Sequence, residues 1–183
     1  MAILKFEDEW HVEPFQWTYQ TGIWDSDFYR EMIDSLPDLK DYRQYNERYK
    51  NRYLYPARDG IWKIVEDSFR GLFGDNIRVQ LCRDLPGYSI GPHTDGKKET
   101  MTLLYYLPRN ANHPEAGTSV YEPLDPDFRC DGTKHHVFGL FRKLWTAEYV
   151  PNSMFGFIRS DNSFHGVEPS VIVRDLIQVS VWR

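Results

Sequence analysis

The hydrophobic and polar positions of the chain follow two different periods. In residues 1–24 apolar side chains alternate with polar ones in places, as at Phe15, Trp17 and Tyr19, which predicts an edge or first strand. Between residues 25 and 76 the apolar positions recur every three or four residues, which is typical of helices. After Asn76 the alternation returns at residues 77–82, and the pattern predicts mainly β-structure almost to the end of the chain.

Two helices are predicted in the middle stretch. Asp25 or Ser26 can cap the first helix, and Pro37 ends it. The second helix runs from about Asp59 to Arg70, and glycines follow it. The apolar faces expected to be buried are Phe28, Met32 and Leu36 in the first helix and Ile61, Ile64, Val65, Phe69 and Leu72 in the second.

The rest of the chain predicts short strands separated by turns, namely residues 77–82, 102–107, 118–121, 154–158 and 171–182. Residues 122–147 are rich in Asp, Pro, Lys and His, and we interpret them as an insertion loop. His135 and His136 lie in this loop and are interpreted as surface residues. Helices followed by many short strands favour an α+β fold that is mainly β, with a sandwich or barrel core.

The length and net charge of the chain limit the fold and the classes of function that it fits. A chain of 183 residues predicts a single domain over 1–183, with a strand and helices in 1–76 and a β core in 77–183. The net charge of −5 argues against a protein that mainly grips duplex nucleic acid. We expect no membrane span and a cytoplasmic location, because the chain has neither a secretory signal nor a long apolar run. Cys82 and Cys130 are interpreted as reduced thiols.

Residues 42–58 interleave five tyrosines with five basic residues. Such a stretch could bind an anionic substrate or a nucleotide. An amphipathic segment that lies over the core is the simpler interpretation, and the sequence leaves both open.

The candidate chemistry centres on the triplet His93, Thr94 and Asp95. In a strand, residues i and i+2 point to the same face, so the imidazole and the carboxylate would converge. The triplet alone is weak evidence, because 6 His and 16 Asp give roughly 0.5 such triplets by chance. His165, 72 residues after His93 and at a predicted turn, offers a third ligand. Two histidines and one carboxylate with open positions form the ligand set of non-haem Fe(II) oxygenases.

Arg174 lies nine residues after His165 on the last predicted strand. There its guanidinium could clamp a carboxylate through two hydrogen bonds. On that strand it would share a face with Leu176, Gln178 and Ser180. Each candidate alone has a plain structural explanation, such as a core histidine or half of a buried ion pair. Their order and surroundings favour a joint function.

From about Ile77 to Trp182 the chain resembles the Fe(II)- and 2-oxoglutarate-dependent oxygenases, within them the prolyl-hydroxylase-like branch. The matching blocks are GYSIGPHTD, TLLYYLP, AGTSVYEP, VPNSMFGFIRSDNSFHGVEPS and VRDLIQVSVW. The resemblance implies a double-stranded β-helix, or jelly roll, with the N-terminal helices packed on one sheet. It also implies Fe(II), 2-oxoglutarate and O2 as cofactor and cosubstrates.

Carried over by position, the resemblance makes His93, Asp95 and His165 the iron ligands. Arg174 and Tyr106 would bind the distal carboxylate of 2-oxoglutarate. One position departs from the pattern: where those hydroxylases carry a further cosubstrate-contacting tyrosine, ten residues before the first histidine, this chain has Arg83. The polar contacts around the cosubstrate are therefore expected to differ.

The function implied is a dioxygenase that hydroxylates a C–H bond of a peptidyl residue or a small metabolite, with release of succinate and CO2. The alternatives are a jelly-roll module that binds a metal or ligand without turnover, and a nucleic-acid demethylase of the same superfamily. A cupin-type enzyme is disfavoured because the chain has no H-x-H motif with a following Glu. Because the sequence ends at Arg183, directly after the last predicted strand, we expect residues 42–58 and 122–147 to border the mouth of the site. The sequence specifies neither the substrate nor the oligomeric state.

Overall fold

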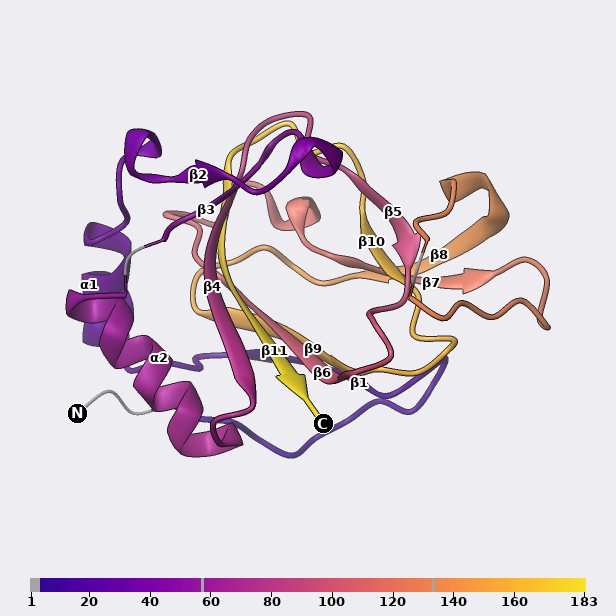
Figure 1. The fold of residues 1–183 in the computed structure, drawn as a ribbon, viewed down its shortest axis with the longest axis horizontal. Helices are drawn as coiled ribbons and strands as arrows, with labels where there is room; N and C mark the ends of the chain where they lie inside the picture. The colour runs from indigo at the N-terminus through magenta and orange to yellow at the C-terminus, as the bar shows by residue number, and fades with distance from the viewer. Residues whose placement is uncertain (1–3, 57, 133) are drawn as a thin grey trace.

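The computed structural model describes residues 4–56, 58–132 and 134–183. Its helices are α1 (Ser26–Asp34) and α2 (Gly60–Phe73), with short 3-10 turns at Leu39–Asp41, Glu47–Tyr49, Pro114–Ala116 and Phe138–Leu140. Its strands are β1 (Trp17–Thr21), β2 (Arg43–Gln44), β3 (Arg52–Leu54), β4 (Ile77–Asp84), β5 (Ile90–His93), β6 (Glu99–Tyr106), β7 (Ser119–Pro123), β8 (Phe141–Thr146), β9 (Ser153–Ile158), β10 (His165–Val167) and β11 (Arg174–Trp182). The strands form two sheets, and both helices lie beside the larger one (Figure 1).

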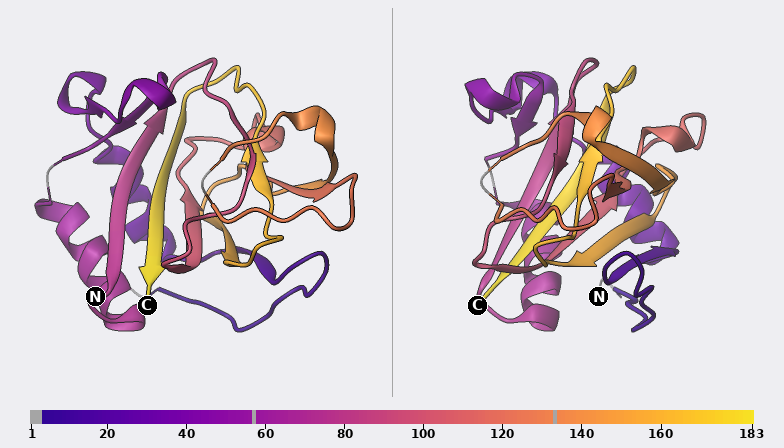
Figure 2. Two further views of the ribbon diagram at one scale, coloured as in Figure 1. Left: turned by 45° about the vertical axis from the view of Figure 1, so that its right-hand side comes forward. Right: turned by 90° about the vertical axis from the view of Figure 1, so that its right-hand side faces the viewer.

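The larger sheet has seven strands in the order β1-β9-β6-β11-β4-β3-β2. The smaller has four, in the order β5-β10-β7-β8. All of these pairings are antiparallel. The last strand, β11, lies between β4 and β6 in the larger sheet, and its long pairing with β4 can be followed in both views of Figure 2. The N-terminal part of the chain contributes three strands to this sheet, so it does not only cover it.

The two predicted helices are present. The Asp25 side chain caps α1 by accepting hydrogen bonds from the backbone N–H groups of Asp27 and Phe28, a contact that typically stabilises a helix by about 1 kcal/mol. Helix α2 ends at Gly74, whose φ of 78° suits glycine. A hydrophobic cluster joins both helices to the outer face of the larger sheet; its members include Met32, Ile33, Trp62, Val65, Phe69, Leu81, Leu103, Tyr105, Ile177 and Val179. The predicted packing of the N-terminal helices on one sheet is confirmed.

A second cluster fills the space between the sheets, with Leu104, Tyr106, Phe155 and Leu176 from the larger sheet and Val120 from the smaller. Successive residues of β11 therefore serve different cores, because side chains alternate across a strand. This arrangement confirms the predicted α+β, mainly β, jelly-roll fold. It also confirms that Leu176 and Ile177 face opposite sides of the sheet.

Two predictions about local structure are wrong. Ile64 and Leu72 of α2 are half exposed rather than buried, because the helix turns Ile61, Trp62 and Val65 toward the sheet instead. Residues 122–147 are not only a loop: they include β8, which pairs with β7 at the outer end of the smaller sheet. The alternation rule did not find this strand, since three consecutive β8 residues, Leu144 among them, are exposed, and its pairing with β7 is irregular at this point.

Neither helix in the described ranges is long and apolar enough to cross a bilayer. Cys82 and Cys130 are both free and buried, in agreement with their interpretation as thiols. The division of the chain at residue 76 stays a prediction.

Candidate metal centre

His93 and His165 meet because two neighbouring strands bring them to the same level. β5 ends at His93 and β10 begins at His165, and the two residues are direct partners in the antiparallel pairing of these strands. The centroids of their rings are 4.3 Å apart. The structure thus joins two histidines that are 72 positions apart in the sequence, as predicted.

The backbone fixes the orientation of both imidazoles. Nδ1 of His93 lies 3.0 Å from the carbonyl oxygen of Gly91, and Nδ1 of His165 lies 3.0 Å from that of Ser163. A carbonyl oxygen only accepts hydrogen bonds, so Nδ1 carries the proton and Nε2 keeps its lone pair. This arrangement is what metal-binding histidines require.

Asp95 completes the cluster from the segment that follows β5. Its Oδ1 lies 3.8 Å from Nε2 of His93 and 3.6 Å from Nε2 of His165. The ligand atoms of the three residues all lie within 4.8 Å of one another. The other carboxylate oxygen, Oδ2, accepts a hydrogen bond of 2.5 Å from the hydroxyl of Thr102 on β6.

Burial keeps the two histidines neutral. It lowers the pKa of His165 from 6.5 to about 4, and it lowers the pKa of His93 well below 6.5, with a further contribution from the neighbouring His165. Two neutral imidazoles and a carboxylate are a donor set that suits Fe(II) and related divalent metals. The residues present therefore fit the metal that the resemblance implies.

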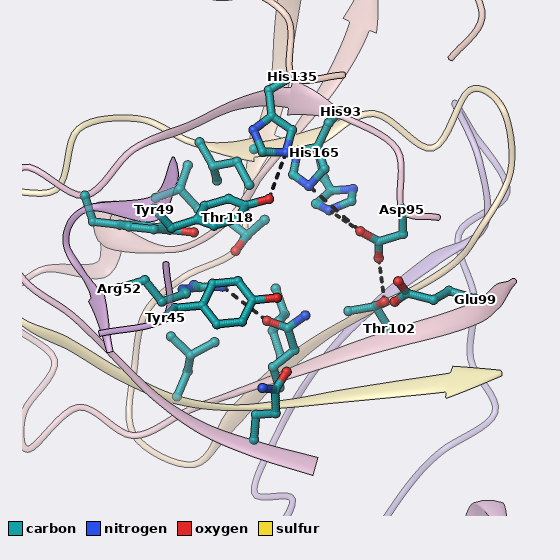
Figure 3. A pocket seen from close by; sticks show the side chains of 18 of the residues that line it. Tyr45, Tyr49, Arg52, His93, Asp95, Glu99, Thr102, Thr118, His135 and His165 are labelled. Carbon is teal, nitrogen blue, oxygen red and sulfur yellow. Dashed lines mark hydrogen bonds and ion pairs between the residues drawn. The ribbon is translucent and has the colours of Figure 1, made fainter. Parts of the chain in front are cut away.

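The cluster lies on the wall of a cavity of about 280 Å³. Figure 3 shows His93, His165 and Asp95 together on one side, with Tyr45, Tyr49 and Arg52 across from Asp95. The lining also includes Leu54, Gln80, Tyr88, Leu104, Thr118, Arg174, Leu176 and Gln178. The space beside these three residues is therefore large enough for a small ligand, and its walls are largely polar.

Arg174 faces this cavity, as predicted, but a carboxylate of the chain itself is its partner. The residue is fully buried, and its Nη1 donates a hydrogen bond of 3.2 Å to Oδ2 of Asp84. Arg52 donates two further hydrogen bonds to the same carboxylate, one of 2.7 Å from Nε to Oδ1 and one of 2.8 Å from Nη2 to Oδ2. One buried acidic residue thus holds two guanidinium groups.

Arg83 does not reach the cavity. It lies on the opposite face of β4 and forms an ion pair with Asp175, with Nε to Oδ1 at 2.6 Å and Nη2 to Oδ2 at 3.1 Å. Its guanidinium also lies over the ring of Tyr42. The departure from the family pattern at this position is therefore a packing feature on the helix side of the sheet.

Tyr106 is buried between the sheets and does not line the cavity in the described part of the chain. Its hydroxyl accepts a hydrogen bond of 3.0 Å from the backbone N–H of Thr118, which does line the cavity. Direct contact between Tyr106 and a cosubstrate stays a prediction.

The interpretation of His135 and His136 as surface residues is wrong, since both are half-buried. The ring centroid of His135 lies 4.5 Å from that of His93, and its Nε2 lies 3.2 Å from the Tyr49 hydroxyl. The segment docks on β5 through a hydrogen bond from the His136 N–H to the Pro92 carbonyl, at 2.9 Å. Gly91 permits this approach, because a Cβ there would lie 2.1 Å from the His136 carbonyl oxygen.

The sequence did not indicate that Arg52, Asp84 and His135 would lie at or beside this cavity. The basic, aromatic composition of residues 42–58 was a signal for Arg52, although it did not single out that residue. Asp84 had a weaker signal, since alternation along β4 places it on the same face as Gln80 and Cys82. Nothing in the spacing distinguished His135.

No family model and no curated protein matches the sequence. The structure is similar to that of a prolyl-4-hydroxylase from Pseudomonas putida, with a TM-score of 0.62 and 15% identity over 91% of this chain and 92% of that one. It is also similar to a prolyl hydroxylase from Trichoplax adhaerens, with a TM-score of 0.60 and 14% identity over 91% of this chain and 83% of that one.

HygX from Streptomyces hygroscopicus, solved with nickel, 2-oxoglutarate and hygromycin B bound, shares the fold with a TM-score of 0.55 and 9% identity, over 91% of this chain and 82% of that one. At such identities the likeness shows the fold alone. The expected structural relationship to the prolyl-hydroxylase-like oxygenases is confirmed at that level.

Proposed function

We propose that the protein is an Fe(II)- and 2-oxoglutarate-dependent dioxygenase. It hydroxylates a C–H bond of a peptidyl residue or a small metabolite and releases succinate and CO2. The observation that carries the proposal is the convergence of His93, Asp95 and His165 on the wall of a cavity that also contains Arg174. The fold shared with prolyl hydroxylases agrees with it.

In this proposal, Nε2 of His93, Nε2 of His165 and Oδ1 of Asp95 hold the metal. The proton on each Nδ1 and the hydroxyl of Thr102 keep these donor atoms aimed at a common point. When bound, Fe(II) and 2-oxoglutarate supply the means to activate O2 for attack on a C–H bond. The protein contributes binding, orientation and a partly enclosed cavity.

Arg174 binds the distal carboxylate of 2-oxoglutarate. Its Nε is buried and has no hydrogen-bond partner in the described part of the structure, although Nη1 contacts Asp84. The Tyr88 hydroxyl and the Thr118 hydroxyl, both on residues that line the same cavity, are buried without a described partner as well. Because an unpaired buried polar group is costly, these atoms favour a polar ligand at this end of the cavity.

Tyr45, Tyr49 and His135 border the space next to the metal ligands, where the substrate would lie. The contact between Tyr49 and His135 joins the 42–58 segment to the 122–147 segment beside His93. These segments therefore form part of the substrate-binding mouth, and their aromatic rings restrict the entry of water. The free cysteines fit a reducing compartment such as the cytoplasm, where we propose that the enzyme acts.

Succinate production tests the proposal. The purified protein, with Fe(II), ascorbate and 2-oxoglutarate, is incubated with a panel of peptides and polar metabolites, and succinate is measured against a no-substrate control. We expect at least one substrate to stimulate succinate release, and the Asp95→Ala variant to show none. A folded protein that binds metal and 2-oxoglutarate but is not stimulated by any member of a broad panel would favour the non-catalytic binding module.

A further inference from the structure

We infer that Arg52 sets the charge of the cosubstrate carboxylate subsite: together with Asp84 it gives the site around Arg174 one net positive charge, to which a ligand carboxylate binds. The inference rests on the proposed function, since it assigns this subsite to 2-oxoglutarate. Arg52 is a positioning residue for the ligand, and it comes from the N-terminal segment rather than from the jelly-roll core.

The sheet itself brings the three charges together. Arg52 on β3 and Arg174 on β11 are both direct cross-strand partners of Asp84 on β4. The acidic residue therefore lies between two arginines on adjacent strands, with its carboxylate fully buried. Opposite charges on directly paired residues stabilise such a sheet, so the register fixes both guanidinium groups in place.

Three neighbouring side chains hold the guanidinium of Arg52. Two hydrogen bonds join it to Asp84, and Nη1 donates a third, of 3.2 Å, to Oε1 of Gln178 on β11. Its Cζ lies 4.5 Å from the centroid of the Tyr88 ring. The side chain is only 14% exposed, so solvent screens its charge weakly.

The charges of Arg52, Asp84 and Arg174 do not balance. Two guanidinium groups and one carboxylate leave one positive charge, and the ion pairs of the described residues give neither arginine a second acidic partner. A buried, uncompensated charge is destabilising. A carboxylate beside the free Nε of Arg174 would compensate it, which makes the cluster a built subsite for one anionic group.

Arg52 therefore strengthens binding of the ligand carboxylate through its charge, without touching the ligand. Without it, Asp84 and Arg174 form a neutral pair, and Asp84 repels an incoming carboxylate. Removing the charge of Asp84 in the same variant leaves Arg174 alone and restores one positive charge. If Arg52 only held β3 in place, removing the charge of Asp84 would not restore binding of the ligand to the Arg52 variant.

The experiment is calorimetric titration of 2-oxoglutarate into protein loaded with Mn(II), which is used as an inert stand-in for Fe(II). We expect Arg52→Met to weaken 2-oxoglutarate binding by roughly 30-fold, because the subsite loses its net positive charge where solvent screens weakly. The Arg52→Met/Asp84→Asn variant should regain most of that affinity. Mn(II) affinity should stay as in the unchanged protein, because the proposed metal ligands belong to β5, β10 and the segment after β5 and form none of the contacts described for Arg52.

Arg43→Met is the matched control, because this arginine is in the same segment but exposed and outside the cavity lining. Its 2-oxoglutarate affinity should be unchanged. Equal affinities of the double and single variants, or full affinity of Arg52→Met, would overturn the inference. If Arg52→Met does not fold, the Asp84→Asn variant tests the inference by itself. This variant should bind 2-oxoglutarate more tightly than the unchanged protein, and weaker binding would contradict the inference.

Titration of the unchanged protein distinguishes a failure of the proposed function from a failure of the Arg52 inference alone. If it binds Mn(II) but no 2-oxoglutarate, the proposed function itself fails, and the charge assignment fails with it. If it binds both and only the Arg52 variants depart from expectation, the proposed function stands without this inference.

Discussion

The hydroxyl of Thr102 donates a hydrogen bond of 2.5 Å to Oδ2 of Asp95. Thr102 belongs to the seven-stranded sheet, whereas His93 and His165 belong to the four-stranded one. This hydrogen bond therefore orients the Asp95 carboxylate from the opposite sheet and leaves Oδ1 directed toward the histidines.

Replacing Thr102 by Val removes this hydroxyl and keeps the shape of the side chain. We expect metal affinity to fall by about 10- to 100-fold, the usual effect of losing a group that orients a ligand. Calorimetric titration with Mn(II) measures it. Thr100→Val is the control, because the Thr100 hydroxyl on the same strand donates to the carbonyl of Val181 instead. Equal losses in the two variants would show that the Thr102 effect is not specific to Asp95.

Replacing Arg174 by Met keeps the length of the side chain and removes its charge. We expect this variant to bind metal normally but to lose on the order of 2 to 5 kcal/mol of 2-oxoglutarate binding free energy. Arg174→Lys should lose less, because it keeps the charge without the bidentate geometry. Unchanged 2-oxoglutarate affinity in the Met variant, measured by titration, would remove the cosubstrate assignment.

The metal affinity should be insensitive to mild acid. Protons compete with the metal for Nε2, and two histidines of pKa 6.5 would lose on the order of a hundredfold in affinity between pH 7.5 and 5.5. Burial holds the pKa of His165 at about 4 and that of His93 well below 6.5, so both rings stay neutral throughout this range. We therefore expect little change in Mn(II) affinity. A hundredfold fall would show that the site is more open to solvent than the structure indicates.

The contact between Tyr49 and His135 couples two segments at the mouth. Once a substrate is identified, we expect its binding to slow hydrogen exchange in the peptides around Tyr49 and in those around His135 together. The measurement compares the metal-loaded protein with and without that substrate. Unchanged exchange in both segments would mean that they do not cover the site.

The features of the fold and of the candidate site that depend on local pattern could be predicted from the sequence. The alternation in residues 77–82 predicted a strand with one apolar face, and Asp25 with Pro37 bounded the region of the first helix. The triplet His93 to Asp95 was identifiable because a histidine and a carboxylate two residues apart can converge, although β5 ends at His93 and Asp95 lies in the segment after it. His165 and Arg174 required the resemblance as well, since spacing of 72 and nine residues has no geometric meaning until the strands are paired.

The remaining features of the site depend on the register of paired strands and on how loop segments pack on the sheets. Local sequence pattern does not encode either. The grouping of Arg52, Asp84 and Arg174 requires β3, β4 and β11 to be neighbours with these residues in line, across 32 and 90 positions of sequence. β8 was missed because its consecutive exposed residues break the alternation expected of a strand, and because the segment around it is rich in polar residues. His135 reaches His93 only because its segment docks on β5.

The most direct test of the central claim is an anaerobic titration of Fe(II) and then 2-oxoglutarate into the purified protein, compared with the His93→Ala variant. We predict that the unchanged protein binds one Fe(II) per chain and that 2-oxoglutarate binds tightly only after the metal. His93→Ala, with its fold verified by circular dichroism, should lose Fe(II) binding or retain it only very weakly. Full-strength Fe(II) binding by that folded variant would contradict the assignment of His93, Asp95 and His165 as the metal centre.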